Sequence, residues 1–265
     1  MRLSIVTISY NQGRYLRECL DSVVSQIEPG DEYIVCDPGS VDGSREILGN
    51  YLRRNEISCL QLEPDGGPPD GLNRGFMRAH GDIYAYLNSD DFYLPGSLMR
   101  VRRYFSDHPG VDVLVSPVRI ARDNGRLAAR PRAPDPISAE RIAGGCCFYV
   151  QQGTFIRATA FKRTAGFNVG NLTCWDYELI ADLAASGATI RRYLRPLAAF
   201  RIHSDSITGR SDNGQRYAAD LARIRGRLSA ALGPKPAQSV WIRISQRVRR
   251  LGLSRRLIES VLSII

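Results

Sequence analysis

The sequence predicts an α/β fold in which helices flank a mostly parallel, doubly wound sheet. Short apolar runs of strand length alternate with segments whose apolar residues recur at helical spacing. Polar clusters follow four of these runs, at residues 9–13, 37–44, 63–70 and 88–91. Because ligands of such sheets bind at the carboxyl ends of the strands, the clusters predict a single site at one edge.

The predicted elements follow one another regularly over the first 120 residues. Apolar runs predict strands over 3–9, 33–36, 57–62, 83–87 and 111–116. Helical spacing predicts helices over 15–27, 44–52 and 70–79. Parallel strands joined by helices of this length require right-handed crossovers, which gives the doubly wound sheet.

The pattern becomes less regular after residue 117. Asp123-Asn124-Gly125 predicts a hairpin turn, and three prolines between 131 and 136 mark an irregular stretch. A helix is predicted over 176–186, where Gly187 ends it, and an extended segment over 189–200.

The net charge of +9 is concentrated near the C-terminus of the 265-residue chain. Residues 216–265 hold eleven basic residues and two acids, so the remainder is neutral. This distribution argues against a nucleic-acid-binding protein, which more often carries its charge on the folded surface. The six cysteines show no CxxC spacing, which predicts reduced residues in a cytosolic compartment. Neither a signal peptide nor a membrane-spanning helix is expected.

Two adjacent carboxylates, Asp90 and Asp91, end the apolar strand over 83–87. Like charges at the end of a core strand repel each other, and desolvating them is costly unless a positive group lies beside them. A divalent cation such as Mg²⁺ or Mn²⁺ satisfies this requirement and often bridges a carboxylate to a diphosphate. The alternative is that one of the acids caps the helix that Pro95 begins.

The ordered motifs of the chain resemble those of family 2 glycosyltransferases with the Rossmann-like GT-A fold. The matching stretches cover about 1–210 and are VTISYNQGRYLRECLDSVVSQ (6–26), VCDPGSVDGS (35–44), EPDGGPPDGLNRG (63–75), GDIYAYLNSDD (81–91), QQGTFIRATAFKRTAGF (151–167), DYEL (176–179) and RIHSDSITG (201–209). The resemblance implies a glycosyltransferase domain over 1–212, with a nucleotide-sugar half (1–117) and an acceptor half (118–212). Residues 213–265 would then form a basic, amphipathic helical tail.

The resemblance gives two residues a role in binding the base of a nucleotide sugar. Asp37 would accept a hydrogen bond from the imide N–H of uracil or a similar base, and Tyr10 would line the base pocket. The alternatives are an Asx-turn or helix cap for Asp37 and a surface aromatic for Tyr10. Asp42, where the second helix begins, is interpreted as a cap.

The loop over 63–70 and the helix after it match a donor-binding motif of the family. Asp65 and Asp70 are expected to frame the nucleotide-sugar pocket, while Asn73 and Arg74 lie on the helix that follows. A basic side chain there would balance the diphosphate. A capped helix with a solvated face is the alternative.

The resemblance also assigns the metal ligands. Asp91 is predicted to bind Mn²⁺ or Mg²⁺ directly, Asp90 to reach the ribose or the water shell of the metal, and His203 to approach the metal or the diphosphate. The cation would act as a Lewis acid on the leaving nucleoside diphosphate.

A general base is needed to take the proton of the acceptor hydroxyl. Asp176 is the predicted base, with Glu178 as the second candidate and a helix N-cap as the alternative role for Asp176. Trp175 replaces the acid that the family often carries before this Asp and is predicted to stack on the acceptor sugar. Gln152 is expected, with Thr154, to contact a donor or acceptor sugar.

The resemblance implies an inverting, metal-dependent glycosyltransferase. It would move a sugar from a nucleoside diphosphate, UDP above all, to a hydroxyl on a glycan or lipid-linked glycan acceptor during surface glycan synthesis. One alternative is a catalytically inactive homologue that binds glycans or forms a scaffold at a membrane. A dinucleotide-dependent oxidoreductase is disfavoured, because the turn after the first strand, Ser-Tyr-Asn-Gln-Gly, has one glycine.

The C-terminal segment 238–265 predicts two amphipathic helices divided near Gly252. Six arginines alternate with apolar residues there, and Trp241 lies at the start. Such helices are typical of peripheral binding to a membrane surface. Docking on the catalytic domain and contact with a second copy of the chain are the alternatives. The predicted location is therefore the cytoplasm, with association at the inner face of the membrane.

Overall fold

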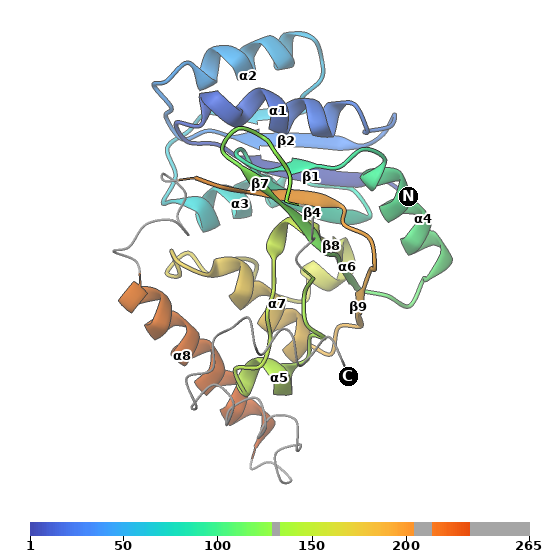
Figure 1. The fold of residues 1–265 in the computed structure, drawn as a ribbon, viewed down its shortest axis with the longest axis vertical. Coiled ribbons are helices and arrows are strands. Elements are labelled where there is room, and N and C mark those ends of the chain that lie inside the picture. Colours follow the sequence, from blue (N-terminus) through green and yellow to red (C-terminus); the bar gives the residue numbers. More distant parts are fainter. Residues whose placement is uncertain (129–132, 204–213, 234–265) are drawn as a thin grey trace.

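The computed structural model describes residues 1–128, 133–203 and 214–233. Its centre is a seven-stranded sheet with the order β3-β2-β1-β4-β8-β6-β9 (Figure 1). In this sheet only the pairs made by β8 are antiparallel, which confirms the predicted, mostly parallel α/β architecture. The strands are β1 (Leu3–Ile8), β2 (Glu32–Cys36), β3 (Cys59–Gln61), β4 (Ile83–Asn88), β6 (Val113–Val115), β8 (Thr154–Arg157) and β9 (Ile190–Arg192).

Helices cover both faces of the large sheet (Figure 1). On one face lie α1 (Gly13–Val24), α2 (Ser44–Arg53) and α4 (Ser97–Asp107). On the other lie α3 (Pro68–Met77), α6 (Ala158–Phe161) and α7 (Trp175–Ala185). Successive side chains of β4 point to opposite faces of the sheet. Ala85 packs in the first core cluster, and Tyr84 and Tyr86 pack in the second.

Local contacts explain where two of these helices begin and how closely one packs. Asp42 accepts a hydrogen bond from the N–H of Gly13, the first residue of α1, at 2.7 Å, and others from the N–H and hydroxyl of Ser44, the first residue of α2, at 3.1 and 2.6 Å. It thus satisfies N–H groups at the start of both helices, although the N-cap residue of α2 is Gly43. Helix α3 starts with two prolines and lies so close to β1 that a Cβ atom at Gly75 would meet Val6 Cγ1 at 2.5 Å. Glycine is therefore required at this position by packing.

A second, three-stranded sheet pairs a late strand of the domain with two earlier ones. Its order is β5-β10-β7, with β5 at Phe92–Tyr93, β7 at Val118–Arg122 and β10 at Ala198–Ile202. The extended segment predicted over 189–200 is thus two strands, β9 and β10, in two different sheets. Because β10 pairs with β5, it places the residues after it beside the acidic motif.

The C-terminal helix α8 (Gly214–Leu232) packs against the body of the protein. Its Ile224 and Leu228 are buried in a third apolar cluster with α7 and α5 (Ala139–Ala143), and Figure 1 shows α8 beside α5. A short 3₁₀ turn, Gln151–Gly153, completes the described elements. The predicted tail helices over 238–265 lie outside the described residues.

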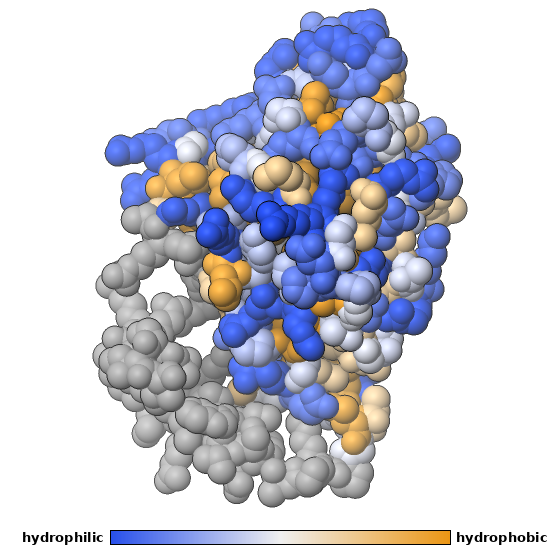
Figure 2. Space-filling model, turned by 90° about the vertical axis from the view of Figure 1, so that its right-hand side faces the viewer, coloured by the Kyte–Doolittle hydropathy of each residue, from blue (hydrophilic) through white to orange (hydrophobic). Residues whose placement is uncertain are grey.

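The visible surface is mostly hydrophilic, and the cysteines are unpaired. On the face shown in Figure 2, hydrophilic side chains dominate and the apolar patches are small and separate. All six cysteines are free, and four of them are buried, as predicted. Within the described ranges, no helix has both the length and the apolar character needed to cross a membrane.

The packing of α8 predicts where the chain can be shortened. Ending it at residue 212 uncovers the apolar faces of α5 and α7 and removes the cations that pair with the buried Glu178. We expect a loss of unfolding free energy on the order of 5 kcal/mol. The full-length chain is the reference. Urea unfolding of both chains checks this, and equal midpoints would contradict it.

Candidate active site

The polar segments after β1, β2 and β4 meet at one edge of the large sheet, as the sequence predicts. The N–H of Asn11 donates to Ser40 Oγ at 2.8 Å, and Asn11 Oδ1 accepts from the N–H of Val41 at 2.9 Å. The N–H of Ser89 donates to the carbonyl of Ile8 at 3.1 Å. Three separate stretches of sequence therefore form one continuous polar surface.

The two tandem aspartates occupy very different environments. Asp91 is 1% exposed, and both its oxygens accept hydrogen bonds at 2.8 Å, one from the N–H of Arg201 and one from Gln152 Nε2. Burial and then the charge of Asp90 raise the pKa of the Asp91 carboxyl, against the opposing effect of these two donors. Asp90 instead faces His203, whose Nε2 lies 2.9 Å from Asp90 Oδ2.

A buried guanidinium fixes the backbone of this acidic motif. The side chain of Arg201 is 2% exposed and lies over the rings of Tyr15 and Phe92, at 4.8 and 5.4 Å from their centroids. Its Nε donates to the carbonyl of Asp90 at 2.9 Å, its Nη1 reaches two carbonyls of the 122–123 turn, and its Nη2 pairs with Glu18. Sequence reasoning missed Arg201, although it lies two residues before His203.

These contacts distinguish the two acids. Both oxygens of Asp91 are engaged inside the protein, whereas Asp90 and His203 form a carboxylate–imidazole pair. Such a pair suits a divalent cation that completes its coordination with diphosphate oxygens and water. Among the described residues, no cluster of three or more His, Cys, Asp and Glu side chains could hold a metal ion.

The predicted base-pocket residues lie at the edge formed by β1 and β2. Asp37 is 1% exposed and accepts from the N–H groups of Gly39 and Ser40, at 3.1 and 2.8 Å, and from Ser40 Oγ at 2.6 Å. This is the Asx-turn that the Pro-Gly-Ser sequence allowed. Tyr10 is 61% exposed next to it. Binding of a base by these residues stays a prediction.

The predicted donor loop is organised by its own acids. Asp65 accepts from the N–H of Gly67, and Asp70 accepts from the N–H of Gly66, both at 2.8 Å. Burial raises the pKa of Asp65, while the Gly66 N–H lowers that of Asp70. Arg74 pairs with Asp70 at 2.9 Å and donates to a loop carbonyl at 2.7 Å, so its charge is already balanced within the loop.

Asn73 joins the two halves of the domain. Its Nδ2 donates to the carbonyl of Phe167 at 2.8 Å, and its Oδ1 accepts from the N–H of Phe167 at 2.9 Å. The reciprocal pair of bonds resembles one step of a strand ladder. The structure therefore gives Asn73, predicted as a donor contact, the role of holding the 161–167 segment against α3.

Asp176 lies in the first turn of α7 and is half-buried. Desolvation raises the pKa of its carboxyl to about 6, despite the N–H groups at the start of the helix that lower it. Burial raises the pKa of Tyr86 most, and the charges of Asp176 and Asp91 raise it further. Tyr86 is therefore within electrostatic reach of both acids, which lie 85 residues apart in the sequence.

One prediction about the neighbours of Asp176 is wrong. Glu178 is not available as a base, because its buried carboxylate is paired with Arg223, and hydrogen bonds lower its pKa to about 2. Trp175 is 7% exposed and packs in the second core cluster, and its stacking on an acceptor sugar stays a prediction. Among the described residues, the buried atoms Trp175 Nε1, Tyr86 Oη and Gln152 Oε1 have no hydrogen-bond partner.

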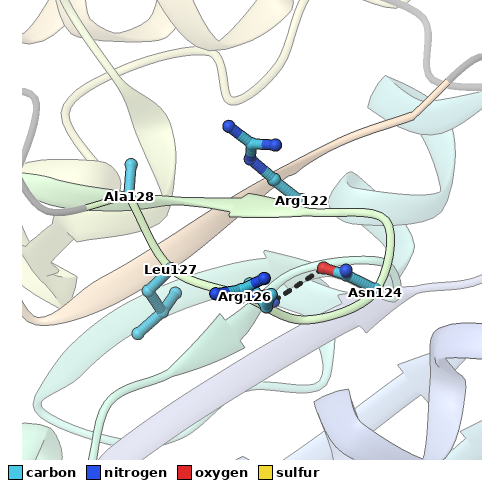
Figure 3. A pocket seen from close by; sticks show the side chains of 5 residues that line it. All are labelled: Arg122, Asn124, Arg126, Leu127 and Ala128. Atoms are coloured by element: carbon cyan, nitrogen blue, oxygen red, sulfur yellow. Dashed lines mark hydrogen bonds between the residues drawn. The ribbon is translucent and has the colours of Figure 1, made fainter.

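A basic hairpin borders the site. Its turn follows β7, where Arg122 is in register with Ile202, the residue before His203. A hollow of about 310 Å³ is lined by Arg122, Asn124, Arg126, Leu127 and Ala128. Figure 3 shows Arg122 pointing away from the side on which Asn124 accepts a hydrogen bond from the N–H of Arg126, at 3.1 Å. The observed turn confirms the predicted hairpin.

Comparison with known proteins identifies a family. The sequence model for glycosyl transferase family 2 matches residues 4–165. The chain is 24% identical over 234 residues to an uncharacterized glycosyltransferase of Nostoc sp., covering 84% of this chain and 72% of that protein. It is 29% identical over 137 residues to the putative teichuronic acid biosynthesis glycosyltransferase TuaG of Bacillus subtilis, covering 51% and 54%.

Solved structures share the fold. The 1–349 fragment of S. aureus TarS in complex with UDP-GlcNAc superposes with a TM-score of 0.68 at 18% identity, covering 86% of this chain and 66% of that one. The mannosyltransferase PcManGT of Pyrobaculum calidifontis, in complex with GDP-Man and Mn²⁺, gives 0.60 at 13% identity, covering 96% and 81%. These likenesses confirm the predicted GT-A fold.

The pairing of Glu178 predicts a pH dependence of stability. The pKa of Glu178 is about 2 in the folded protein and near the ordinary 4.5 in the unfolded chain. Its contribution to the unfolding free energy is therefore complete above pH 4.5 and is lost as the pH falls toward 2. We expect Glu178→Gln to lower the unfolding free energy by about 2–3 kcal/mol at pH 7, and the deficit to shrink below pH 4. Urea unfolding at several pH values measures this. The exposed Glu46→Gln is the control, and a deficit that does not vary with pH contradicts the assignment.

Proposed function

This chain belongs to glycosyl transferase family 2, and from that premise we propose that it transfers a sugar from a nucleoside diphosphate to a hydroxyl acceptor with inversion at the anomeric carbon. One observation carries the proposal. Trp175, which adjoins Asp176, packs in one buried cluster with Tyr86 of β4, the strand that leads to Asp90 and Asp91. This packing supports a transfer site in which the acidic motif is the donor end and Asp176 is the base end.

The donor end consists of Asp90 and His203. We assign the divalent cation, Mn²⁺ or Mg²⁺, to this pair, because the Asp90 side chain is 13% exposed beside His203, whereas Asp91 is 1% exposed. When bound there, the cation would offset the negative charge that develops on the leaving diphosphate. Asp91 acts indirectly. It accepts a hydrogen bond from the N–H of Arg201 in β10 and so fixes the strand that leads to His203.

The base end is Asp176. An acceptor hydroxyl becomes a sufficient nucleophile when a carboxylate takes its proton as the new bond forms. A pKa of about 6 keeps Asp176 ionised at neutral pH and makes it more basic than an ordinary carboxylate. Because one base acts in a single displacement, the configuration at the anomeric carbon inverts.

Three buried polar atoms on residues near these ends support sugar binding. Tyr86 Oη, Gln152 Oε1 and Trp175 Nε1 are buried polar atoms with no partner in the described part of the chain. Sugar hydroxyls satisfy such atoms, whereas leaving them unbonded is costly. This set also disfavours the inactive-scaffold alternative, since a scaffold does not need a desolvated base beside unbonded polar groups.

The substrates follow from the comparisons by analogy. UDP is the proposed nucleotide because TarS binds UDP-GlcNAc, and a glycan or lipid-linked glycan of the cell surface is the proposed acceptor because TuaG is named for teichuronic acid biosynthesis. Peripheral membrane binding from the cytoplasm remains a prediction about residues 238–265.

Nucleotide binding tests the metal assignment. With UDP at about 100 times its dissociation constant, Mn²⁺ should raise the melting midpoint of the wild-type protein by about 5 °C or more. Asp90→Asn and His203→Ala should lose this metal-dependent rise, while Asp91→Asn should keep it and melt lower at baseline. The opposite result, in which Asp91→Asn alone loses the metal effect, would restore Asp91 as the ligand.

Transfer kinetics test the base. Asp176→Asn should lower kcat by about 10²–10⁴-fold without weakening nucleotide binding. In the wild-type enzyme, kcat/KM should rise with pH through about 6, since the base must be deprotonated. The matched control is Asp182→Asn on the same helix, which pairs with Arg227 and should stay within about threefold. Equal losses in both variants would refute the role of Asp176.

A further inference from the structure

Glu178 joins segments that are distant in the sequence. Arg223 of α8 donates two hydrogen bonds to its carboxylate, at 2.6 and 2.7 Å, although only 2% of the Glu178 side chain is exposed. Asn171 and Asn168, from the loop before α7, donate to Glu178 Oε2 at 2.8 and 3.1 Å. A buried carboxylate with a bidentate cation and two further donors is held far more rigidly than an exposed ion pair.

The same loop is bound to α8 at a second point. Thr173 Oγ1 donates to Asp220 Oδ2 of α8 at 2.6 Å. Asn171 Oδ1 accepts from the N–H of Thr173 at 3.2 Å, which shapes the turn that leads into α7. Contacts with α8 therefore lie on both sides of Asp176, three residues before it at Thr173 and two residues after it at Glu178.

None of these groups touches the reacting atoms in the proposed mechanism. We propose that α8 is a positioning element of the active site: through Arg223 and Asp220 it holds the 168–174 loop and the first turn of α7, and so places the Asp176 carboxylate against the acceptor. This inference rests on the proposed function, because it assumes that Asp176 is the base.

A positioning role for α8 predicts different effects at the base end and at the donor end of the site. A base must lie within hydrogen-bond reach of the acceptor hydroxyl, and a displacement of about 1 Å can cost about 10²-fold in rate. Asp90 belongs to the acidic motif, where its carbonyl accepts a hydrogen bond from Arg201 Nε and its Oδ2 lies 2.9 Å from His203 Nε2. Loosening α8 should therefore impair transfer and leave donor binding intact.

The experiment compares two arginines of α8 in the full-length protein. Arg223→Gln removes the bidentate grip on Glu178. Arg227→Gln is the matched control, because Arg227 pairs chiefly with Asp182, one turn beyond Glu178, and lies 3.6 Å from Glu178. Each variant is tested for kcat, for donor KM and for its Mn²⁺-dependent melting rise with UDP.

Trp175 supplies a readout that does not depend on activity. It is one of two tryptophans in the chain, adjoins Asp176 and is 7% exposed. In a Trp241→Phe background, acrylamide quenching of fluorescence reports how well the start of α7 is held.

For Arg223→Gln we expect kcat to fall about 10- to 100-fold, donor KM to stay within about twofold, and Trp175 to be quenched more readily. For Arg227→Gln, kcat and quenching should stay close to wild type. Equal effects of the two substitutions, or wild-type quenching in Arg223→Gln, would overturn the proposal. If the wild-type protein transfers no sugar, the proposed function fails, while quenching still decides whether Arg223 holds the loop.

A variant with an unpaired buried charge can fail to fold, so the double substitution Glu178→Gln with Arg223→Gln is the second test. Removing both charges avoids the lone buried carboxylate and should recover much of the melting midpoint. A positioning role predicts that kcat stays reduced and Trp175 stays quenchable in the double variant. Full recovery of both would mean that the pair serves only charge balance, and the proposal would be wrong.

Discussion

The site depends on the burial of the Arg201 guanidinium. A charged group removed from water is stable only when its donors are satisfied, and Arg201 meets this condition with the carbonyl of Asp90, two carbonyls of the 122–123 turn and the Glu18 carboxylate. The partners come from α1, the acidic motif and the β7 hairpin. None of these segments can move independently without leaving part of the guanidinium unbonded. The positive charge also offsets the repulsion between the two adjacent aspartates.

The edge of the sheet is built from contacts between loops more than from the strands themselves. Asn11 bonds Ser40 and Val41, Asn73 bonds Phe167, and Thr173 bonds Asp220. Each of these contacts uses a short polar side chain to satisfy backbone or carboxylate groups of a remote segment. The result is a rigid frame in which Asp176 is the exception: its carboxylate is desolvated, and no cation among the described residues pairs with it. In such a frame, hydrogen bonds and ion pairs fix the surrounding polar side chains, and the Asp176 carboxylate stays available to react.

The parallel half of the sheet and the convergence of its polar ends could be predicted, because apolar runs and the residues after them are local signals. Strand β8 could not be, since its four residues are defined by register with β4 and β6. The difference between Asp90 and Asp91 was equally hidden. It arises from Arg201 and Gln152, which lie 110 and 61 residues away from Asp91 in the sequence. Asp37 and Asp70 match motifs of the family, and their hydrogen bonds show that they also build the turns they occupy, as the Asx-turn alternative for Asp37 predicted.

The reversed direction of β8 has a consequence for interpreting sequences of this architecture. In a parallel strand the residues that reach the ligand edge come after the strand, as they do for β1, β2 and β4. An antiparallel strand inserted among them begins at that edge, so the residues that it places at the edge come before the strand. Gln151 and Gln152, whose amides reach the carbonyl of Tyr86 and the carboxylate of Asp91, stand directly before β8 for this reason. Glutamines or other amides upstream of a short apolar run therefore merit the same scrutiny as acids downstream of one.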